Sequence, residues 1–344
     1  METPILARVI RGETVESVHR GHLVAVGGDG AVLLSVGDPG TVTFFRSACK
    51  PLQAIPLITT GASHAFGLTD DEVALACASH SGERVHVRVA AKMLGKTGLS
   101  ERHLQCGKHL PFSDKETKRL LRANEKITQL HNNCSGKHAA MLAVAKHIGA
   151  NPATYVSTDH PVQLAILKTI SMFCEIPVQK IAIGIDGCCV PNYAMPLNAM
   201  ARGFLNLIAP RNDFADERIR SASKRIVSAM ARYPALIGGT ERLDTILMKA
   251  APGKIISKVG ADGVWMCGIL PSARFPKGAA IALKVEDGDD KRARPAVAIE
   301  LLRSLGVLSK TDLAEFSPMS IENRRGDAVG RVEASLGLRR SRKT

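Results

Sequence analysis

The order of strand-like and helix-like segments along the 344 residues restricts the possible folds most strongly. Residues 22–36 hold two apolar runs around a Gly-Gly-Asp-Gly turn, which predicts a β-hairpin. From about residue 70 to 250 the pattern is mainly helical, and three further strand-like runs then follow between residues 254 and 287. Strands from the two chain ends would therefore form one mostly antiparallel sheet, with the helical middle packed beside it.

The middle of the chain carries several local helix signals. Residues 113–116, Ser-Asp-Lys-Glu, form a capping box that predicts a helix start. Residues 159–173 begin with an Asp cap and have a proline in the first turn. One short strand-like run at 180–186 interrupts the helices and leads into a Gly-Cys-Cys-Val-Pro loop. We expect an α/β protein with further helices at 135–150, at 217–233 and, closing the unit, at 294–306. Its sheet part would comprise about 1–65 and 250–344, and its helical part about 66–249.

Composition excludes several classes of protein. The net charge is +14, but the charges are spread along the chain, aromatic residues are only 4% and no nucleic-acid motif is present. We therefore expect no nucleic-acid partner, while an anionic substrate would suit a positive field. The eight cysteines are dispersed and include no C-x-x-C pair, so most are expected to be small core residues. No apolar signal core and no run of membrane-span length occurs, which predicts a cytoplasmic protein.

The segment FRSACKPLQA places Ser47 three residues before Lys50. Residues i and i+3 share one face of a helix. A lysine kept neutral by burial or by a nearby positive charge can take the serine proton and make the hydroxyl nucleophilic. Because this spacing also arises by chance in chains of this length, the rest of the sequence has to support it.

Two later segments extend this pattern. Ser79 ends an apolar segment, and Lys258 begins the triplet Lys258-Val259-Gly260 at the end of a strand-like run. The order S-x-x-K, serine, K-x-G is that of serine β-lactamases and penicillin-recognising enzymes. Folding would bring Ser79 and Lys258 together beside the first pair, and the two lysines would lower each other's pKa. Backbone N–H groups at the start of the Ser47 helix could stabilise an oxyanion. An S-D-N motif is missing and Val259 lacks a hydroxyl, so a β-lactam substrate is not expected.

A second cluster contains thiols and nitrogen donors. Cys134, Lys137 and His138 lie in HNNCSGKHAA, and Asp186 and Cys188 lie in IDGCC. Two thiols and a nitrogen donor could hold Zn²⁺. Spacing alone does not separate a metal site from a buried cysteine beside a solvent-facing lysine. By chemistry His138 is the more usual ligand, since a lysine must lose its proton to bind.

Seven segments occur in an order that resembles one known family. They are FRSACKPLQ, CASHSGE, QCGKHLPF, HNNCSGKHAAML, DHPVQ, IDGC-x-VP and GGTERLDT. Over nearly the whole chain this series is similar to the rhizobial-type (class 3) L-asparaginases, the asparaginase II family. The resemblance implies a serine β-lactamase-like fold and a homodimer. It also implies an amidohydrolase that converts L-asparagine and water to L-aspartate and ammonia.

The resemblance also implies a role for individual residues. Ser47 would be the nucleophile and Lys50 its base, with Ser79 and Lys258 as a supporting pair that relays protons. The implied zinc ligands are Cys134, Lys137 and Cys188, with a water completing a tetrahedron. The ion would orient the α-amino and α-carboxyl groups of the substrate rather than act on the amide. Three further positions are expected to line the pocket and bind substrate: Arg46, His138 and Asp186.

Two positions depart from the family pattern. Cys189 stands where the family usually has glycine, so it could perturb its loop or offer a competing thiol. Asp244 stands where some relatives have a further cysteine, and we assign it no role.

Two other classes of function stay open at this stage. Thr240 could be the nucleophile of an amidohydrolase that cleaves itself to expose an N-terminal threonine, although the preceding glycines also suit a tight turn before a helix. A zinc-dependent or basic binding protein would be supported by the net charge and the cysteines alone. Such a protein would have no need of the Ser47–Lys50 pair.

Overall fold

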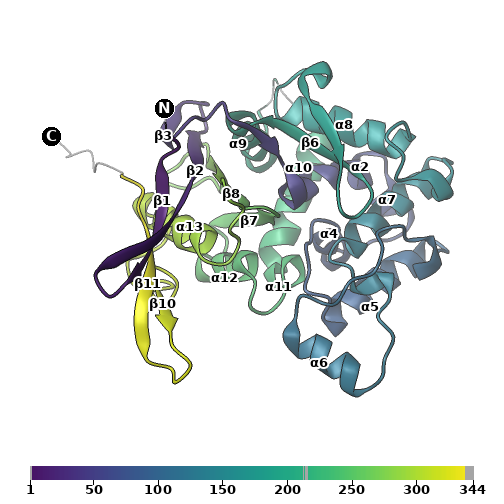
Figure 1. Cartoon of the computed structure of the whole chain (residues 1–344). Coiled ribbons are helices and arrows are strands. Elements are labelled where there is room, and N and C mark those ends of the chain that lie inside the picture. The colour runs from purple at the N-terminus through teal and green to yellow at the C-terminus, as the bar shows by residue number, and fades with distance from the viewer. Residues whose placement is uncertain (1, 212, 214–215, 338–344) are drawn as a thin grey trace.

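The computed structural model describes residues 2–211, 213 and 216–337. Its main feature is an antiparallel sheet in the order β10-β11-β1-β2-β9-β8-β7, with β3 pairing to β2 (Figure 1). Both chain ends contribute strands, as the sequence predicts. The strands are β1 Ile5–Arg11, β2 Thr14–Gly27, β3 Val32–Val36, β7 Ile255–Gly260, β8 Val264–Ile269, β9 Ala279–Val285, β10 Met319–Glu322 and β11 Ala328–Ala334.

The helices occupy most of the middle of the chain and lie largely to one side of the sheet (Figure 1). Helix α7 is buried on nearly every side, among α4, α5 and α8. The α-helices before it are α1 Lys50–Gln53, α2 Ile55–Thr59, α3 Ala62–Ala65, α4 Asp70–Ala76, α5 Arg84–Lys96 and α6 Asp114–Arg122. From α7 onward they are α7 Ser135–His147, α8 Pro161–Phe173, α9 Leu197–Ile208, α10 Glu217–Arg232, α11 Pro234–Ile237, α12 Leu243–Ala250 and α13 Ala293–Ser304.

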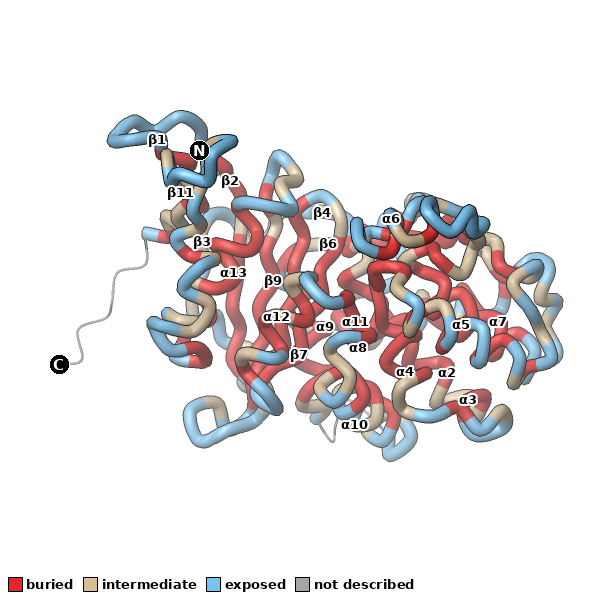
Figure 2. Tube along the Cα trace, turned by 90° about the horizontal axis from the view of Figure 1, so that it is seen from below, coloured by how far each residue is buried: buried red, intermediate tan, exposed pale blue. Residues whose placement is uncertain are grey.

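The sheet is most completely buried toward its β9-β8-β7 end (Figure 2). Every residue of β7 and β8 is buried, because helices cover the strands. Helices α10 and α12 pack on β7, α9 packs on β2, β8 and β9, and α13 packs on β1 and β11 and also contacts β8 and β9. Cover by more than one helix explains why β7, β8 and β9 appear in the sequence as continuous apolar runs. It also places the end of β7, with Lys258, inside the protein.

Several sequence predictions need correction. Helix α13 does not close the unit, because β10 and β11 follow it and β11 pairs with β1. The run at 180–186 is indeed a strand, but it belongs to a second sheet in the order β4-β6-β5. Helix α8 is capped by His160, whose side chain accepts from the Val162 N–H, and not by an aspartate. The strands of this second sheet are β4 Val42–Phe44, β5 Ala182–Ile185 and β6 Pro191–Pro196.

Other local predictions are confirmed. Ser113 caps α6 by accepting from the Glu116 N–H. All eight cysteines are unpaired thiols, and each except Cys189 is buried. None of the helices within the described ranges is long and apolar enough to cross a membrane.

Candidate active site

The segment that carries Ser47 begins with strained backbone. Arg46 adopts a left-handed conformation with φ 53°, and its N–H donates to Asn192 Oδ1 at 3.0 Å. Residues Arg46–Cys49 then form a 3₁₀ turn that runs directly into α1. Left-handed backbone at a non-glycine residue is unfavourable and is often found at functional sites. Here it turns the chain from β4 so that Ser47 reaches a cavity.

The Lys50 side chain lies inside the protein. It is fully buried, and its Nζ donates to Ala78 O at 2.6 Å and lies 2.9 Å from Ser79 Oγ. Among the hydrogen bonds of the described residues, none joins Ser47 Oγ to Lys50 Nζ. The i, i+3 spacing therefore brings the two residues onto one turn without making the expected direct contact.

Ser79 is the point at which the two lysines meet. Its Oγ lies 2.9 Å from Lys50 Nζ and also 2.9 Å from Lys258 Nζ. Its backbone N–H donates to Ile237 O at 2.9 Å, which fixes the residue beyond the end of α4. A hydroxyl can accept from an ammonium while it donates to a neutral amine. The arrangement can therefore pass a proton between Lys50 and Lys258 through Ser79.

Burial lowers the pKa of Lys258 to about 7, and the Lys50 charge acts in the same direction while Asp244 opposes it. The sequence predicts mutual repulsion of the lysines as the cause, but loss of hydration is the larger effect. A substantial fraction of Lys258 is therefore a neutral amine near pH 7.

Asp244 is a member of this cluster that the sequence did not reveal. It is fully buried, and its Oδ2 lies 3.4 Å from Lys258 Nζ and accepts from the Val259 N–H at 3.1 Å. Its Oδ1 accepts from Ser257 Oγ at 2.7 Å, and Trp265 Nε1 donates to the same hydroxyl at 2.9 Å. Asp244 thus holds the strand residues around Lys258 in place. No local pattern could have indicated this, because the contact forms only when α12 packs on β7.

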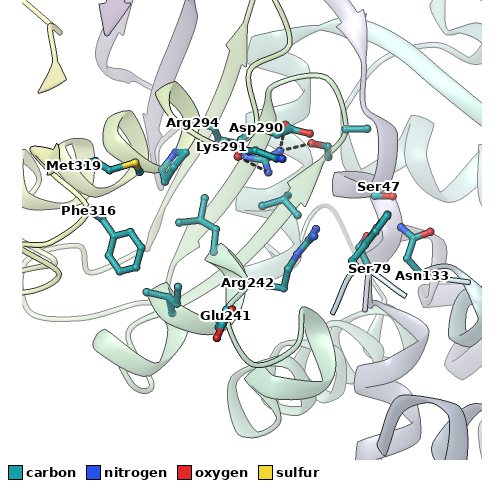
Figure 3. Close-up of a pocket in the computed structure, with 17 residues that line it drawn as sticks. Ser47, Ser79, Asn133, Glu241, Arg242, Asp290, Lys291, Arg294, Phe316 and Met319 are labelled. Atoms are coloured by element: carbon teal, nitrogen blue, oxygen red, sulfur yellow. Dashed lines mark hydrogen bonds and ion pairs between the residues drawn. The ribbon is translucent and has the colours of Figure 1, made fainter. Parts of the chain in front are cut away.

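Ser47 and Ser79 open into the same cavity, which has a volume of about 500 Å³ (Figure 3). Lys50 and Lys258 lie behind the serines and are not among the lining residues. The other walls are the end of β7, the start of α12 and the start of α13. The lining residues are Ser47, Ser79, Phe112, Asn133, Glu241, Arg242, Leu243, Ile246, Val259, Gly260, Ala261, Asp290, Lys291, Arg294, Pro295, Phe316 and Met319.

Cys134, Lys137 and Cys188 converge in a second buried cluster. Lys137 Nζ lies 3.0 Å from Cys188 Sγ. A hydrogen bond with Cys134 and the nearby Lys137 charge lower the pKa of Cys188 to about 5, against the effect of burial. Burial opposes the charge of Lys137, but Cys188, Cys134 and Asp186 together raise its pKa. The cluster is therefore a thiolate–ammonium pair with a second thiol.

The donor set of this cluster fits zinc. Two sulfur atoms and one nitrogen are donors that Zn²⁺ accepts, provided Lys137 gives up its proton. In the described part of the chain, no three His, Cys, Asp or Glu side chains form a group that could hold a metal, so a site here requires the Lys137 amine. Asn133 lines the cavity and accepts from Cys134 Sγ at 3.5 Å, which connects this cluster to the serines.

Arg46, His138 and Asp186 do not line the cavity. Arg46 Nε donates to Asp186 Oδ1 at 3.1 Å and its Nη1 pairs with Asp262. Burial lowers the pKa of His138 to about 3, and its Nδ1 lies 2.7 Å from the Tyr155 hydroxyl. Asp186 Oδ2 is 3.7 Å from Cys188 Sγ, so Asp186 and its Arg46 partner lie beside the thiol cluster.

Cys189 has an exposed side chain and a left-handed backbone with φ 73°. Its N–H donates to Asp186 O at 2.9 Å and closes the turn between β5 and β6. Glycine adopts this conformation without steric cost. The glycine that the resemblance implies at this position would therefore suit the turn better than Cys189 does.

Thr240 has an anchoring contact away from the cavity. Its N–H donates to Glu83 Oε1 at 2.9 Å and its hydroxyl lies 3.1 Å from Glu83 Oε2. Thr240 is not one of the residues that line the cavity.

Comparison with known proteins agrees with the sequence motifs. The family model for L-asparaginase II matches residues 7–334, and the chain belongs to that family. This confirms the resemblance drawn from the seven segments and supports an amidohydrolase. A search of curated proteins found no match.

Several solved structures are similar to this one at low sequence identity. A probable glutaminase from Bacillus subtilis, complexed with 6-diazo-5-oxo-L-norleucine, has 12% identity and a TM-score of 0.42, with 84% of this chain and 85% of that chain covered. A β-lactamase from Mycobacterium bovis has 12% identity and a TM-score of 0.40, with 83% and 94% covered. A mutant class A β-lactamase of the last common ancestor of Gram-negative bacteria has 14% identity and a TM-score of 0.38, with 84% and 92% covered.

Proposed function

We propose that this protein hydrolyses the side-chain amide of L-asparagine to give L-aspartate and ammonia. The observation that carries the proposal is the convergence of Lys50 and Lys258 on Ser79, with Ser79 and Ser47 opening into one cavity. Membership of the L-asparaginase II family supports amide hydrolysis as the reaction. Val259 in the cavity wall has no hydroxyl for a β-lactam carboxylate, which favours a linear amide.

In the proposed reaction Ser47 Oγ attacks the amide carbon, because Ser47 lines the cavity and Lys50 lies on the same turn. The hydroxyl proton passes to a neutral lysine amine, Lys50 directly or Lys258 through Ser79. The C–N bond then breaks, and the leaving nitrogen takes a proton and departs as ammonia. A water molecule hydrolyses the aspartyl ester by the reverse proton path. Contacts of this kind often shorten only when substrate binds.

Cys134, Lys137 and Cys188 would hold a zinc ion in this proposal. When bound, the ion would supply a fixed positive charge that helps to orient the polar end of the substrate. Asn133 joins that cluster to the cavity, and Arg46 keeps Asp186 beside Cys188. The homodimer and the cytoplasmic location stay predictions from the resemblance and from the composition.

The test is a substrate panel. We expect the protein to release ammonia from L-asparagine, to act less on L-glutamine, whose amide is one methylene farther out, and to take no label from a fluorescent penicillin. Hydrolysis of neither amide, with zinc present and with zinc chelated, would reject the proposal. Covalent labelling by the penicillin would favour the β-lactam class instead.

A further inference from the structure

Arg242 places a cation in the wall of the cavity. It lines the cavity together with Ser47 and Ser79, and its side chain points into the space between them and the start of α13 (Figure 3). Within the described residues, its guanidinium makes no hydrogen bond or ion pair and lies over the Phe112 ring, with Cζ 5.1 Å from the ring centroid. An arginine over an aromatic face keeps its N–H edge available to a ligand.

The loop that carries Arg242 is fixed to the segment that carries Ser79. Ile237 O accepts from the Ser79 N–H at 2.9 Å, and Gly238 O accepts from Ser81 Oγ at 2.8 Å. Thr240 is held by two hydrogen bonds to Glu83. These contacts hold the backbone of the loop beside the Ser79 segment before a ligand arrives. Preorganisation of this kind is what a specific binding site requires.

The other charges in the cavity are less suited to bind an anion beside the serines. Arg294 Nη1 donates to Gly260 O at 2.7 Å and pairs with Asp290. Lys291 is exposed just before α13. Glu241 also lines the cavity, and its side chain is exposed to solvent. Among the described residues that line the cavity, Arg242 is therefore a cation with an open donor edge, on a loop that is tied to the Ser79 segment.

We propose that Arg242 binds the α-carboxylate of the substrate and so selects side-chain amides of amino acids over simple amides. The proposal rests on the proposed function, because it names the group of L-asparagine that this residue recognises. It assigns the α-carboxylate to Arg242 and leaves the α-amino group to the zinc site that the resemblance implies, which revises the expectation that the ion orients both groups. A guanidinium binds a carboxylate through two parallel hydrogen bonds, which fixes orientation as well as position. With the carboxylate held there, the side-chain amide carbon is presented to the serines.

The experiment compares L-asparagine with 3-aminopropanamide, which keeps the amino group and the amide but lacks the carboxylate. In Arg242→Met we expect kcat/KM for L-asparagine to fall roughly 10- to 100-fold, mainly through KM, because a charged hydrogen-bond pair is lost. For 3-aminopropanamide we expect less than a twofold change. Arg242→Lys should recover part of the loss. Arg88→Met, which removes an exposed charge from α5, controls for the general field.

Equal losses on both amides would overturn the proposal, because they would show a structural role for Arg242. A binding measurement keeps the test independent of turnover. Calorimetry in a Ser47→Ala background should show L-asparagine binding that weakens roughly 10- to 100-fold when Arg242→Met is added. Unchanged affinity would overturn the assignment of the carboxylate. Absence of ammonia release by the native protein would instead count against the proposed function.

Discussion

Lys258 Nζ lies 2.9 Å from Ser79 Oγ, although the two residues are 179 positions apart in the chain. Lys50 Nζ lies at the same distance from the same oxygen. The serine hydroxyl therefore bridges two buried amines, and the charge state of Lys258 determines which way a proton can move. The predictions below follow from that relationship and from the groups that hold it.

Activity should rise with pH through about 7. Burial lowers the pKa of Lys258 to about 7, so the amine can accept a proton only above that pH. We expect kcat/KM for L-asparagine to increase between pH 6 and 8. In Lys258→Met we expect a loss of about 10²- to 10⁴-fold, the usual contribution of a general base, and no inflection near 7. If the inflection near pH 7 persists in Lys258→Met, it belongs to the titration of another group.

Replacement of Asp244 should shift that profile to lower pH. The Asp244 charge favours protonated Lys258, so Asp244→Asn should lower the lysine pKa further. The variant should also lose about 1–3 kcal/mol of unfolding free energy, because the Val259 N–H faces an amide group instead of a carboxylate. Asp159→Asn, at an exposed aspartate, is the control. A profile that moves to higher pH, or does not move, would contradict the role of Asp244.

The burial of Lys258 should also make stability depend on pH. Its folded pKa is lowered from the ordinary value of 10.5 to about 7, so the unfolded chain binds the extra proton between these limits. The free energy of unfolding should rise with pH across that window and be insensitive to this group below 7. Denaturant unfolding at pH 7 and pH 9 measures this change in unfolding free energy for the native protein and for Lys258→Met. An equal change in the two proteins would show that Lys258 is hydrated in the folded state.

Gly239→Ala should weaken both folding and activity. Gly239 has φ 117°, and a Cβ added there would lie 2.5 Å from Ser81 Oγ. We expect a loss of about 1–3 kcal/mol from backbone strain, and lower activity because Arg242 and Ser79 share this contact region. Gly95→Ala in α5 meets no atom within 4 Å and should stabilise the protein by about 0.5–1 kcal/mol. A neutral Gly239→Ala would mean that the loop is not fixed as described.

Zinc retention should depend on Cys188 and not on Cys189. The Cys188 sulfur lies 3.0 Å from Lys137 Nζ, whereas Cys189 is exposed on the turn. We expect about one zinc per chain after dialysis of the native protein, and a large loss in Cys188→Ser. Cys189→Gly should retain the metal and remove the backbone strain of a non-glycine residue in the left-handed conformation. Equal zinc content in the native protein and Cys188→Ser would exclude the proposed ligand set.

The strands that are buried on both faces were readable from the sequence because they form apolar runs with turns between them. Strands β10 and β11 were not, since β10 alternates exposed and half-buried residues and β11 carries charges that an apolar pattern does not mark. Strand β1 and its partner β11 gain their regularity from pairing with each other, which joins residues over 300 positions apart, such as Ala7 and Ala334.

The candidate site, too, has features that the sequence indicates and features that arise only in the folded protein. The motif around Ser47 and Lys50 was visible, but the direction of the Lys50 side chain depends on Ala78 and Ser79, which reach it only in the fold. Asp244 and Arg242 lie in the segment GGTERLDT, which the resemblance includes. Their roles were not visible there, because Asp244 contacts Lys258 on β7 and Arg242 lines the cavity only in the folded protein. Burial, the main cause of the Lys258 pKa, cannot be seen in a local pattern.

The most direct test of the central claim is ammonia release from L-asparagine at pH 7 to 9 by the native protein, Ser47→Ala and Lys50→Met. The account predicts release by the native protein and its loss in both variants, with each variant folded by circular dichroism. Release that survives in Ser47→Ala would contradict the assignment of the nucleophile and transfer it to Ser79, the hydroxyl that both lysines contact.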